Sequence, residues 1–460
     1  MTTTVYKYCL IIFFLSLQIA LAQRGSEALL IKEDVLLKCD NNKIPSDGRV
    51  ELPRSVKTIA TDAFKDCNRL RYITIAASVT AIGDGAFVSC TSLLQVSIAG
   101  SLTNIGNNAF AFCESLKTIN LPNTLSSVGD WAFRGCTALE SITLPESLTS
   151  LGTGVFSDCT QLKRASFTMK QLEAIPSRLF FGCKQLKEVN LPPVLQRIKS
   201  AAFASCSSLN KIDLPQNLVG IGDDCFENCT TLQAIDIPDT VVYVGASAFH
   251  NCTALTDVKL PYGMRHLQND TFLNCTSLKA IIIPDTVEKI NMQAFRNCTA
   301  LEAIQFPLAL TDIFYGAFYG CKSLQEVTLP EGVAYVGSYA FAFCESLKTI
   351  ELPRAVTVIG IRAFSDCYNL EEVKLSRFTT AIGVQAFLNC KNLKELRLPA
   401  TIEKIDAGAF ENTGLTELHC RAINPPALSG RMGYRGKVVV PFRSLETYKQ
   451  TTGWQDCALE

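Results

Sequence analysis

A cysteine returns at the same place in a repeated unit along most of the chain. Successive cysteines in this column are 23 residues apart, except for one step of 24 residues. A phenylalanine precedes each of them by three residues and a leucine follows each by three residues. Sequence periods of about 20 to 50 residues are typical of solenoids, in which each repeat is one coil that packs on its neighbours. The column consists of Cys67, Cys90, Cys113, Cys136, Cys159, Cys183, Cys206, Cys229, Cys252, Cys275, Cys298, Cys321, Cys344, Cys367 and Cys390.

Each part of the unit predicts a local structure. The unit reads L-x-x-I-x-L-P-x-x-L-x-x-I-G-x-x-A-F-x-x-C-x-x, and residues 104–121 are a clear copy. The alternating apolar residues before the proline, such as Ile119 and Leu121, predict a short strand that ends at Pro122. The glycine after the second apolar pair favours a tight corner with positive φ. The A-F-x-x-C-x-x-L spacing fits about one helical turn with Phe, Cys and Leu buried.

These patterns predict an α/β solenoid of about 16 coils of 23 residues, with parallel strands on an inner face and short helical turns. Residues 50–420 form the repeat array in this interpretation. Residues 23–49 and 421–460 do not follow the register, and we expect them to be an N-terminal and a C-terminal cap, because the open ends of solenoids need covering.

The first residues resemble a secretory signal peptide. Lys7 is followed by the apolar run CLIIFFLSLQI and then by the small-residue site Ala20-Leu21-Ala22. The run is shorter than the roughly 20 residues that span a bilayer. We therefore expect residues 1–22 to be a removed signal peptide, and the mature chain to be secreted or held at the cell surface without a membrane-spanning segment.

The charge balance excludes one class of partner. Forty-three basic side chains oppose 43 acidic ones, for a formal net charge of zero. Nucleic-acid binding depends on a basic surface that attracts phosphates. We therefore expect no nucleic-acid partner.

The cysteines are predicted to be mostly buried, reduced thiols. The column has no C-x-x-C pair, and ligands 23 residues apart lie on separate coils, which argues against a metal site. Side chains that point in parallel from stacked coils also fit disulfide geometry poorly. One disulfide remains a candidate, between Cys420 and Cys457 beside the C-terminal cap.

Catalytic residues are scarce. The only histidines are His250, His266 and His419, which lie in different coils, and no Ser or Cys has a plausible His–Asp set. We expect a protein without enzymatic activity and without cofactor or metal.

The repeat unit LPxxLxxIGxxAFxxCxxLxxI resembles the BspA-type leucine-rich repeat family. The tail VVVPFRSLETYKQTTGW is similar to the closing segment of many such arrays. The resemblance implies a right-handed superhelical horseshoe or arc, exported or at the cell surface. It also implies extracellular partners, since several members are adhesins for host matrix or plasma proteins, or for other microbes. The family supplies no shared catalytic motif.

Two sets of variable residues are candidate partner-binding surfaces. An acidic set stands at outward strand positions, where neighbouring Lys and Arg could equally neutralise it. An aromatic set stands around the repeat phenylalanines, and its alternative role is packing between coils. The acidic set is Glu326, Glu351, Glu372 and Glu395, and the aromatic set is Tyr315, Tyr319, Tyr335, Tyr339, Phe343 and Tyr368.

The sequence therefore predicts a non-catalytic, adhesin-like protein-binding solenoid. Two alternatives stay open: a carbohydrate-binding module, suggested by the tyrosines, and a structural component of a surface layer or biofilm.

Overall fold

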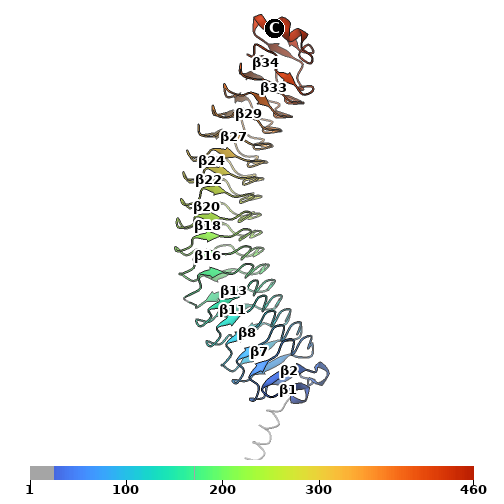
Figure 1. The fold of residues 1–460 in the computed structure, drawn as a ribbon, viewed down its shortest axis with the longest axis vertical. Helices are drawn as coiled ribbons and strands as arrows, with labels where there is room; N and C mark the ends of the chain where they lie inside the picture. Colours follow the sequence, from blue (N-terminus) through green and yellow to red (C-terminus); the bar gives the residue numbers. More distant parts are fainter. Residues whose placement is uncertain (1–24, 170) are drawn as a thin grey trace, which may run out of the picture. The chain divides into compact units, whose positions relative to one another are not determined.

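The computed structural model describes residues 25–169 and 171–460. The signal peptide expected at residues 1–22 lies outside the described residues. The chain divides into two compact units, Met1–Pro215 and Gln216–Glu460, and each consists of stacked coils (Figure 1). Both are β-solenoids with coils of roughly 23 residues, and the chain makes about 18 turns. The solenoid prediction is confirmed.

Unit 1 carries two columns of strands. The first begins with an antiparallel hairpin, β1–β2, and continues as parallel two-residue strands. Its strands are β1 (Leu29–Lys32), β2 (Val35–Cys39), β4 (Thr58–Ile59), β6 (Ala81–Ile82), β8 (Asn104–Ile105), β10 (Ser127–Val128), β12 (Ser150–Leu151), β14 (Ala174–Ile175) and β16 (Arg197–Ile198). The second column holds the strands before the prolines: β3 (Arg49–Glu51), β5 (Tyr72–Ile75), β7 (Gln95–Ile98), β9 (Thr118–Ile119), β11 (Ser141–Leu144), β13 (Arg164–Phe167) and β15 (Glu188–Asn190).

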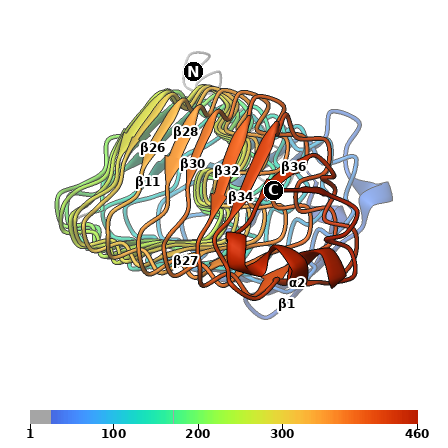
Figure 2. The ribbon, with the colours of Figure 1, turned by 90° about the horizontal axis from the view of Figure 1, so that it is seen from above.

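Unit 2 repeats this plan, and its strand pairs inside the array keep the 23-residue register, as in Ile281↔Ile304 and Ile290↔Ile313. We call the solvent side of its column of strands before the prolines the long-strand face. The strands of this column are β18 (Ala234–Asp236), β20 (Asp257–Lys259), β22 (Ala280–Ile282), β24 (Ala303–Gln305), β26 (Glu326–Thr328), β28 (Thr349–Glu351), β30 (Glu372–Lys374), β32 (Glu395–Leu398), β34 (Glu417–Cys420), β36 (Lys437–Val439) and β37 (Ala458–Leu459). The short-strand column holds β17 (Gly220–Ile221), β19 (Tyr243–Val244), β21 (His266–Leu267), β23 (Lys289–Ile290), β25 (Asp312–Ile313), β27 (Tyr335–Val336), β29 (Val358–Ile359), β31 (Ala381–Ile382), β33 (Lys404–Ile405) and β35 (Ala427–Leu428). Figure 2 shows β26, β28, β30, β32, β34 and β36 side by side along one side of the coils, and β27 on another side.

The end segments add the turns beyond the 16 copies of the sequence unit. Strand β2 pairs in parallel with β4, and β36 pairs in parallel with β34, so both continue the ladders of the array. Helices in the described residues are confined to these ends: η1 (Ser26–Ala28), η2 (Asn41–Lys43), η3 (Phe442–Ser444) and α2 (Leu445–Gln450).

The expected helical turn at A-F-x-x-C is wrong. The segment is a double turn in which the residue two before the phenylalanine and the residue before the cysteine have positive φ, as at Tyr339 (58°) and Phe343 (59°). This conformation directs the N–H groups of Tyr339, Phe341 and Phe343 to carbonyls of the next coil, at 2.8, 2.9 and 2.8 Å. A helix would keep those donors within its own turn, so inter-coil bonding decides the conformation. We call the surface of these double turns the turn edge.

The repeated glycine has a different role from the one expected. Gly83, Gly106 and Gly129 do not have positive φ. A Cβ on Gly83 would instead lie 2.7 Å from Thr61 N, in the preceding coil. The glycine is therefore required because two backbones approach closely, and the left-handed positions lie elsewhere in the coil.

The core is made of side-chain ladders that run from coil to coil. The repeat phenylalanines stack in parallel, with ring centroids 5.2 Å apart for Phe318 and Phe341. The column cysteines are buried, reduced thiols, as predicted. Cys298 Sγ donates to the carbonyl of Phe272 in the preceding coil at 3.1 Å.

Candidate functional site

The turn edge of unit 2 gathers four of the six predicted aromatic residues. The ring centroid of Tyr319 lies 5.0 Å from that of Phe343 and 6.5 Å from that of Tyr339, and the Tyr315 centroid lies 5.4 Å from Tyr339. Tyr315 is exposed, and the other three are half-buried. These four residues, which we call the aromatic cluster, pack on one another across two coils and still present surface to solvent.

Two members of the aromatic cluster occupy positions that disfavour them. Tyr339 and Phe343 have φ of 58° and 59°. The position of Phe343, just before the cysteine, carries Asp, Asn, Ser or Gly in every other coil except that of Phe112, and the position of Tyr339 carries another aromatic residue only at Trp131. A bulky side chain in this left-handed region costs of the order of 1 kcal/mol or more. Residues retained at such a cost concentrate at functional surfaces.

Two arginines cover the aromatic cluster. The guanidinium carbon of Arg296 lies 4.4 Å from the ring centroid of Tyr319, and that of Arg362 lies 5.8 Å from the ring of Tyr339. Each arginine donates to a neutral amide, Gln293 for Arg296 and Gln385 for Arg362. Tyrosine with arginine is the composition that dominates binding energy at protein interfaces.

The two remaining predicted aromatics lie apart from this cluster. Tyr335 is on the short-strand column, in β27, with its ring 5.6 Å from that of Phe314. Tyr368 follows the column cysteine of its coil, where its hydroxyl donates to Asp366 at 3.4 Å. Burial and the Asp366 carboxylate raise the pKa of Tyr368.

The predicted glutamates stand on the long-strand face, and most are neutralised there. Lys374 Nζ lies 3.4 Å from Glu351 and 4.0 Å from Glu372. Glu395 accepts from Arg397 at 2.7 Å and also lies 3.2 Å from His419. The self-neutralised alternative therefore describes Glu351, Glu372 and Glu395.

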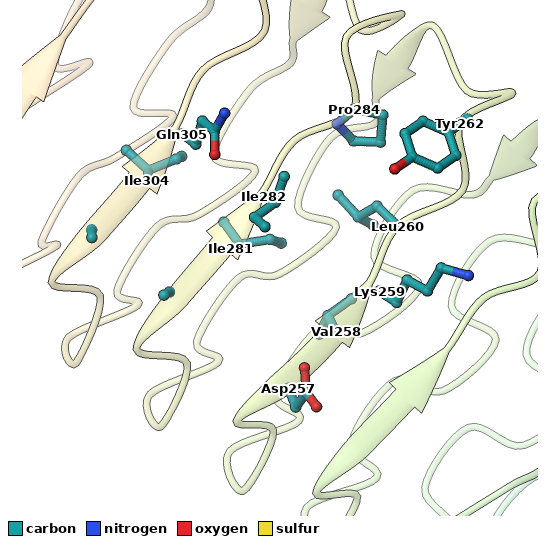
Figure 3. Close-up of a pocket in the computed structure, with 12 residues that line it drawn as sticks. Asp257, Val258, Lys259, Leu260, Tyr262, Ile281, Ile282, Pro284, Ile304 and Gln305 are labelled. Carbon is teal, nitrogen blue, oxygen red and sulfur yellow. The ribbon is translucent and has the colours of Figure 1, made fainter.

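A groove of about 610 Å³ crosses the same face over β20, β22 and β24 (Figure 3). Tyr262, Leu260 and Pro284 lie at one end of it, and Asp257 lies at the other end of β20. Ile282 stands between these ends with 69% of its surface exposed. This site was not predicted from the sequence, although an apolar residue at an outward strand position is the signal that could have found it.

A second aromatic group on the turn edge, in unit 1, was also missed. Phe112 and Trp131 have φ of 61° and 59°, and the Arg134 guanidinium lies 5.5 and 5.2 Å from their rings. Aromatic residues at the two repeat positions that also carry Tyr339 and Phe343 are the signal that could have revealed them.

The structure does not form the disulfide expected between Cys420 and Cys457. Cys420 is a buried thiol whose sulfur lies 3.3 Å from the hydroxyl of Tyr448. Cys457 is a half-buried thiol whose sulfur lies 3.7 Å from the carbonyl of Tyr434. The two sulfur atoms have different partners, so the two cysteines do not form a disulfide although both lie near the C-terminal cap.

The three histidines lie apart, and two of them contact glutamates, whereas the Nδ1 of His266 is buried without a hydrogen-bond partner among the described residues. His250 lies 3.5 Å from Glu227, and His419 lies between Glu395 and Glu417. Within residues 25–169 and 171–460, no group of three or more His, Cys, Asp or Glu is arranged to hold a metal ion. In the same residues, no helix is long and apolar enough to cross a membrane.

The repeat pattern described as the BspA type leucine rich repeat region matches the chain in overlapping segments from residue 46 to residue 423. The chain belongs to the BspA-type leucine-rich repeat family. It is similar to a leucine-rich repeat protein of Bacteroides ovatus, with 31% identity over 81% of this chain and 92% of the other, and a TM-score of 0.64. It also matches a leucine rich cell surface protein of Faecalibacterium prausnitzii, with 25% identity over 75% of this chain and 92% of the other, and a TM-score of 0.43. No curated protein matches it.

Proposed function

We propose that this BspA-type solenoid is an exported, non-catalytic protein-binding protein, and that the aromatic cluster of unit 2 contacts the partner. The observation that carries the proposal is the placement of Tyr339 and Phe343 at left-handed backbone positions. Folding alone favours small or polar residues there, so these side chains are explained by what they contact outside the coil.

The arginines favour a protein partner over a carbohydrate. Sugars stack on open ring faces, whereas the Arg296 guanidinium already lies over the ring of Tyr319 at 4.4 Å. Both arginines donate to neutral glutamines, so each can also bind a partner carboxylate. The charge of Arg296 acts in addition on Asp270 of its own surface, which leaves Arg362 as the less engaged of the two. The partner surface is therefore expected to be acidic and partly apolar.

The test uses a triple variant, Tyr319→Ser, Tyr339→Asn and Phe343→Asn, in residues 23–460. Asparagine occupies the equivalent left-handed positions in other coils, Asn108 for Tyr339 and Asn251 for Phe343, so the fold should be kept and the thermal midpoint should not fall. Wild type and variant are compared in pull-downs of secreted proteins, on a panel of matrix and plasma proteins, and on a glycan array.

We expect the variant to lose at least about tenfold in affinity for the captured protein, as hot-spot truncation does. The matched control is Val242→Ser with Val358→Ser, which removes exposed apolar side chains from the short-strand column. Equal binding by wild type and the triple variant would refute the proposal. Glycan binding would support the carbohydrate alternative, and self-association in sedimentation would support the structural one.

A further inference from the structure

The groove on the long-strand face combines an apolar floor with full access to solvent. Ala280 and Ala303 occupy outward positions of β22 and β24, so their small side chains leave the floor low. Ile282 and Tyr262 rise beside it with 69% and 64% of their surfaces exposed (Figure 3). Leu308, the counterpart of Tyr262 two coils later, is 83% exposed.

This apolar surface interrupts a polar face. Other outward positions from β18 to β26 hold Asp236, Asp257, Lys259, Glu326 and Thr328, of which Asp257 and Lys259 line the groove itself. On strands with one face in solvent, apolar residues point inward and polar residues point outward. Ile282 departs from this alternation, and the small outward residues Ala280 and Ala303 lie beside it. Large apolar side chains grouped on an otherwise polar surface mark interaction sites.

The surroundings of the groove are acidic. The outward positions from β18 to β26, together with the residue after each proline, carry six carboxylates against one lysine. That lysine, Lys259, is shared between Asp236 and Asp239, at 3.6 Å from each. The carboxylates are Asp236, Asp239, Asp257, Asp285, Glu326 and Glu331.

The floor strands cannot accept a further strand from a ligand. Strands β22 and β24 pair with each other in parallel, Ile281 opposite Ile304, and lie within the column of coils. A ligand on this face is therefore held by side chains in the groove and by charges around it, not by β-augmentation.

We propose that the groove binds a basic segment of a partner protein, with one large apolar side chain between Ile282 and Tyr262 and flanking Lys or Arg side chains against the acidic surroundings. The site is separate from the aromatic cluster and takes a ligand of the opposite charge. It goes beyond the proposed function, because either surface can bind when the other is disabled.

The probe is a short fluorescein-labelled peptide with Leu-Phe at its centre and two lysines on each side, measured by fluorescence anisotropy on the full mature chain. Two control peptides carry Ser-Ser at the centre or glutamates at the flanks. The protein variants are Ile282→Ser and Ala303→Tyr, which remove the anchor contact and fill the floor; both residues are exposed, so the core is untouched.

We expect the Leu-Phe peptide to bind, each variant to weaken it by about tenfold or more, and added salt to weaken it further. Val358→Ser, an exposed aliphatic in β29, should leave the affinity unchanged. The proposal is overturned if the peptide does not bind, if the Ser-Ser peptide binds equally well, or if both variants bind like wild type. The triple variant of the aromatic cluster should bind this peptide normally, so failure of the proposed function is recognised separately.

Discussion

A cysteine suits the repeated core position because it is small, apolar and still able to donate a weak hydrogen bond. Cys136 Sγ lies 3.2 Å from the carbonyl of Phe110 in the preceding coil, and the same contact recurs along the column. The same Phe110 carbonyl also accepts from Cys113 N at 3.2 Å within its own coil. In the final copy, Thr413 replaces the cysteine, and its hydroxyl donates to Phe410 at 3.0 Å. The position therefore selects a small donor, not a disulfide partner.

Burial of these thiols predicts loss of stability at alkaline pH. Burial raises the pKa of Cys136 to about 12, whereas an unfolded cysteine ionises near about pH 8.5. Above that pH the unfolded chain loses protons that the folded chain keeps, so stability is full below about pH 8.5 and falls as pH rises toward 12. Each such thiol contributes about 1.4 kcal/mol per pH unit. Thermal melts by circular dichroism should show a constant midpoint near neutrality and a steep fall above about pH 9.

The matched control is Cys457→Ser, which removes a half-buried thiol outside the column and should leave the pH profile nearly unchanged. A thermal midpoint that stays flat up to about pH 11 would contradict the prediction.

Two glycines of unit 2, each at a short strand, differ in the space around them. A Cβ on Gly360 would lie 2.8 Å from Ser338 N in the preceding coil, whereas the nearest atom to a Cβ on Gly220 would be Tyr243 O at 3.9 Å. The first glycine sets how closely two coils approach. The second is replaceable.

We expect Gly360→Ala to lower the free energy of unfolding of unit 2 by about 2 kcal/mol, because backbone must move to admit the methyl group. Gly220→Ala should be neutral or stabilising by up to about 1 kcal/mol, since alanine reduces the entropy of the unfolded chain. Urea unfolding of both variants measures the difference. Equal effects of the two substitutions would show that coil spacing does not depend on the glycine.

At the scale of the whole molecule, the predicted C-terminal cap of residues 421–460 contains two large aromatic side chains. Tyr448 and Trp454 are fully buried there, with their rings 5.0 Å apart in a T-shaped arrangement. Both polar groups are satisfied, Tyr448 by the carbonyl of Ala422 and Trp454 by that of Pro426, each at 2.9 Å. We propose that these aromatic side chains close the open end of the array.

Trp454→Ala should cost about 3 to 5 kcal/mol locally, and the damage should decay along the array because each coil contacts only its neighbours. Hydrogen exchange followed by mass spectrometry should show loss of protection in β33 to β37 and retained protection in β20 to β24. Phe442→Ala, at a residue 91% exposed, is the control and should change neither region. Equal loss of protection throughout unit 2 would contradict the local view.

How far the sequence predicts the binding surfaces depends on the kind of residue. Tyr319, Tyr339 and Phe343 were identified because aromatic residues are conspicuous at variable positions. Arg296 was not, since only the folded coils bring its guanidinium over the Tyr319 ring. The groove was not predicted because its floor is low only where Ala280 and Ala303 have small side chains, and alanine is not conspicuous in a sequence.

The repeat period and the alternation of apolar residues were sufficient to establish the solenoid, its register and its buried Phe, Cys and Leu ladders. They suffice because stacking of equivalent residues follows from any regular coil of constant length. The conformation of A-F-x-x-C, the role of the repeated glycine and the separate partners of Cys420 and Cys457 depended on contacts between coils. Such contacts override local preference: a spacing that fits a helical turn becomes a left-handed double turn when its N–H groups find carbonyls in the next coil.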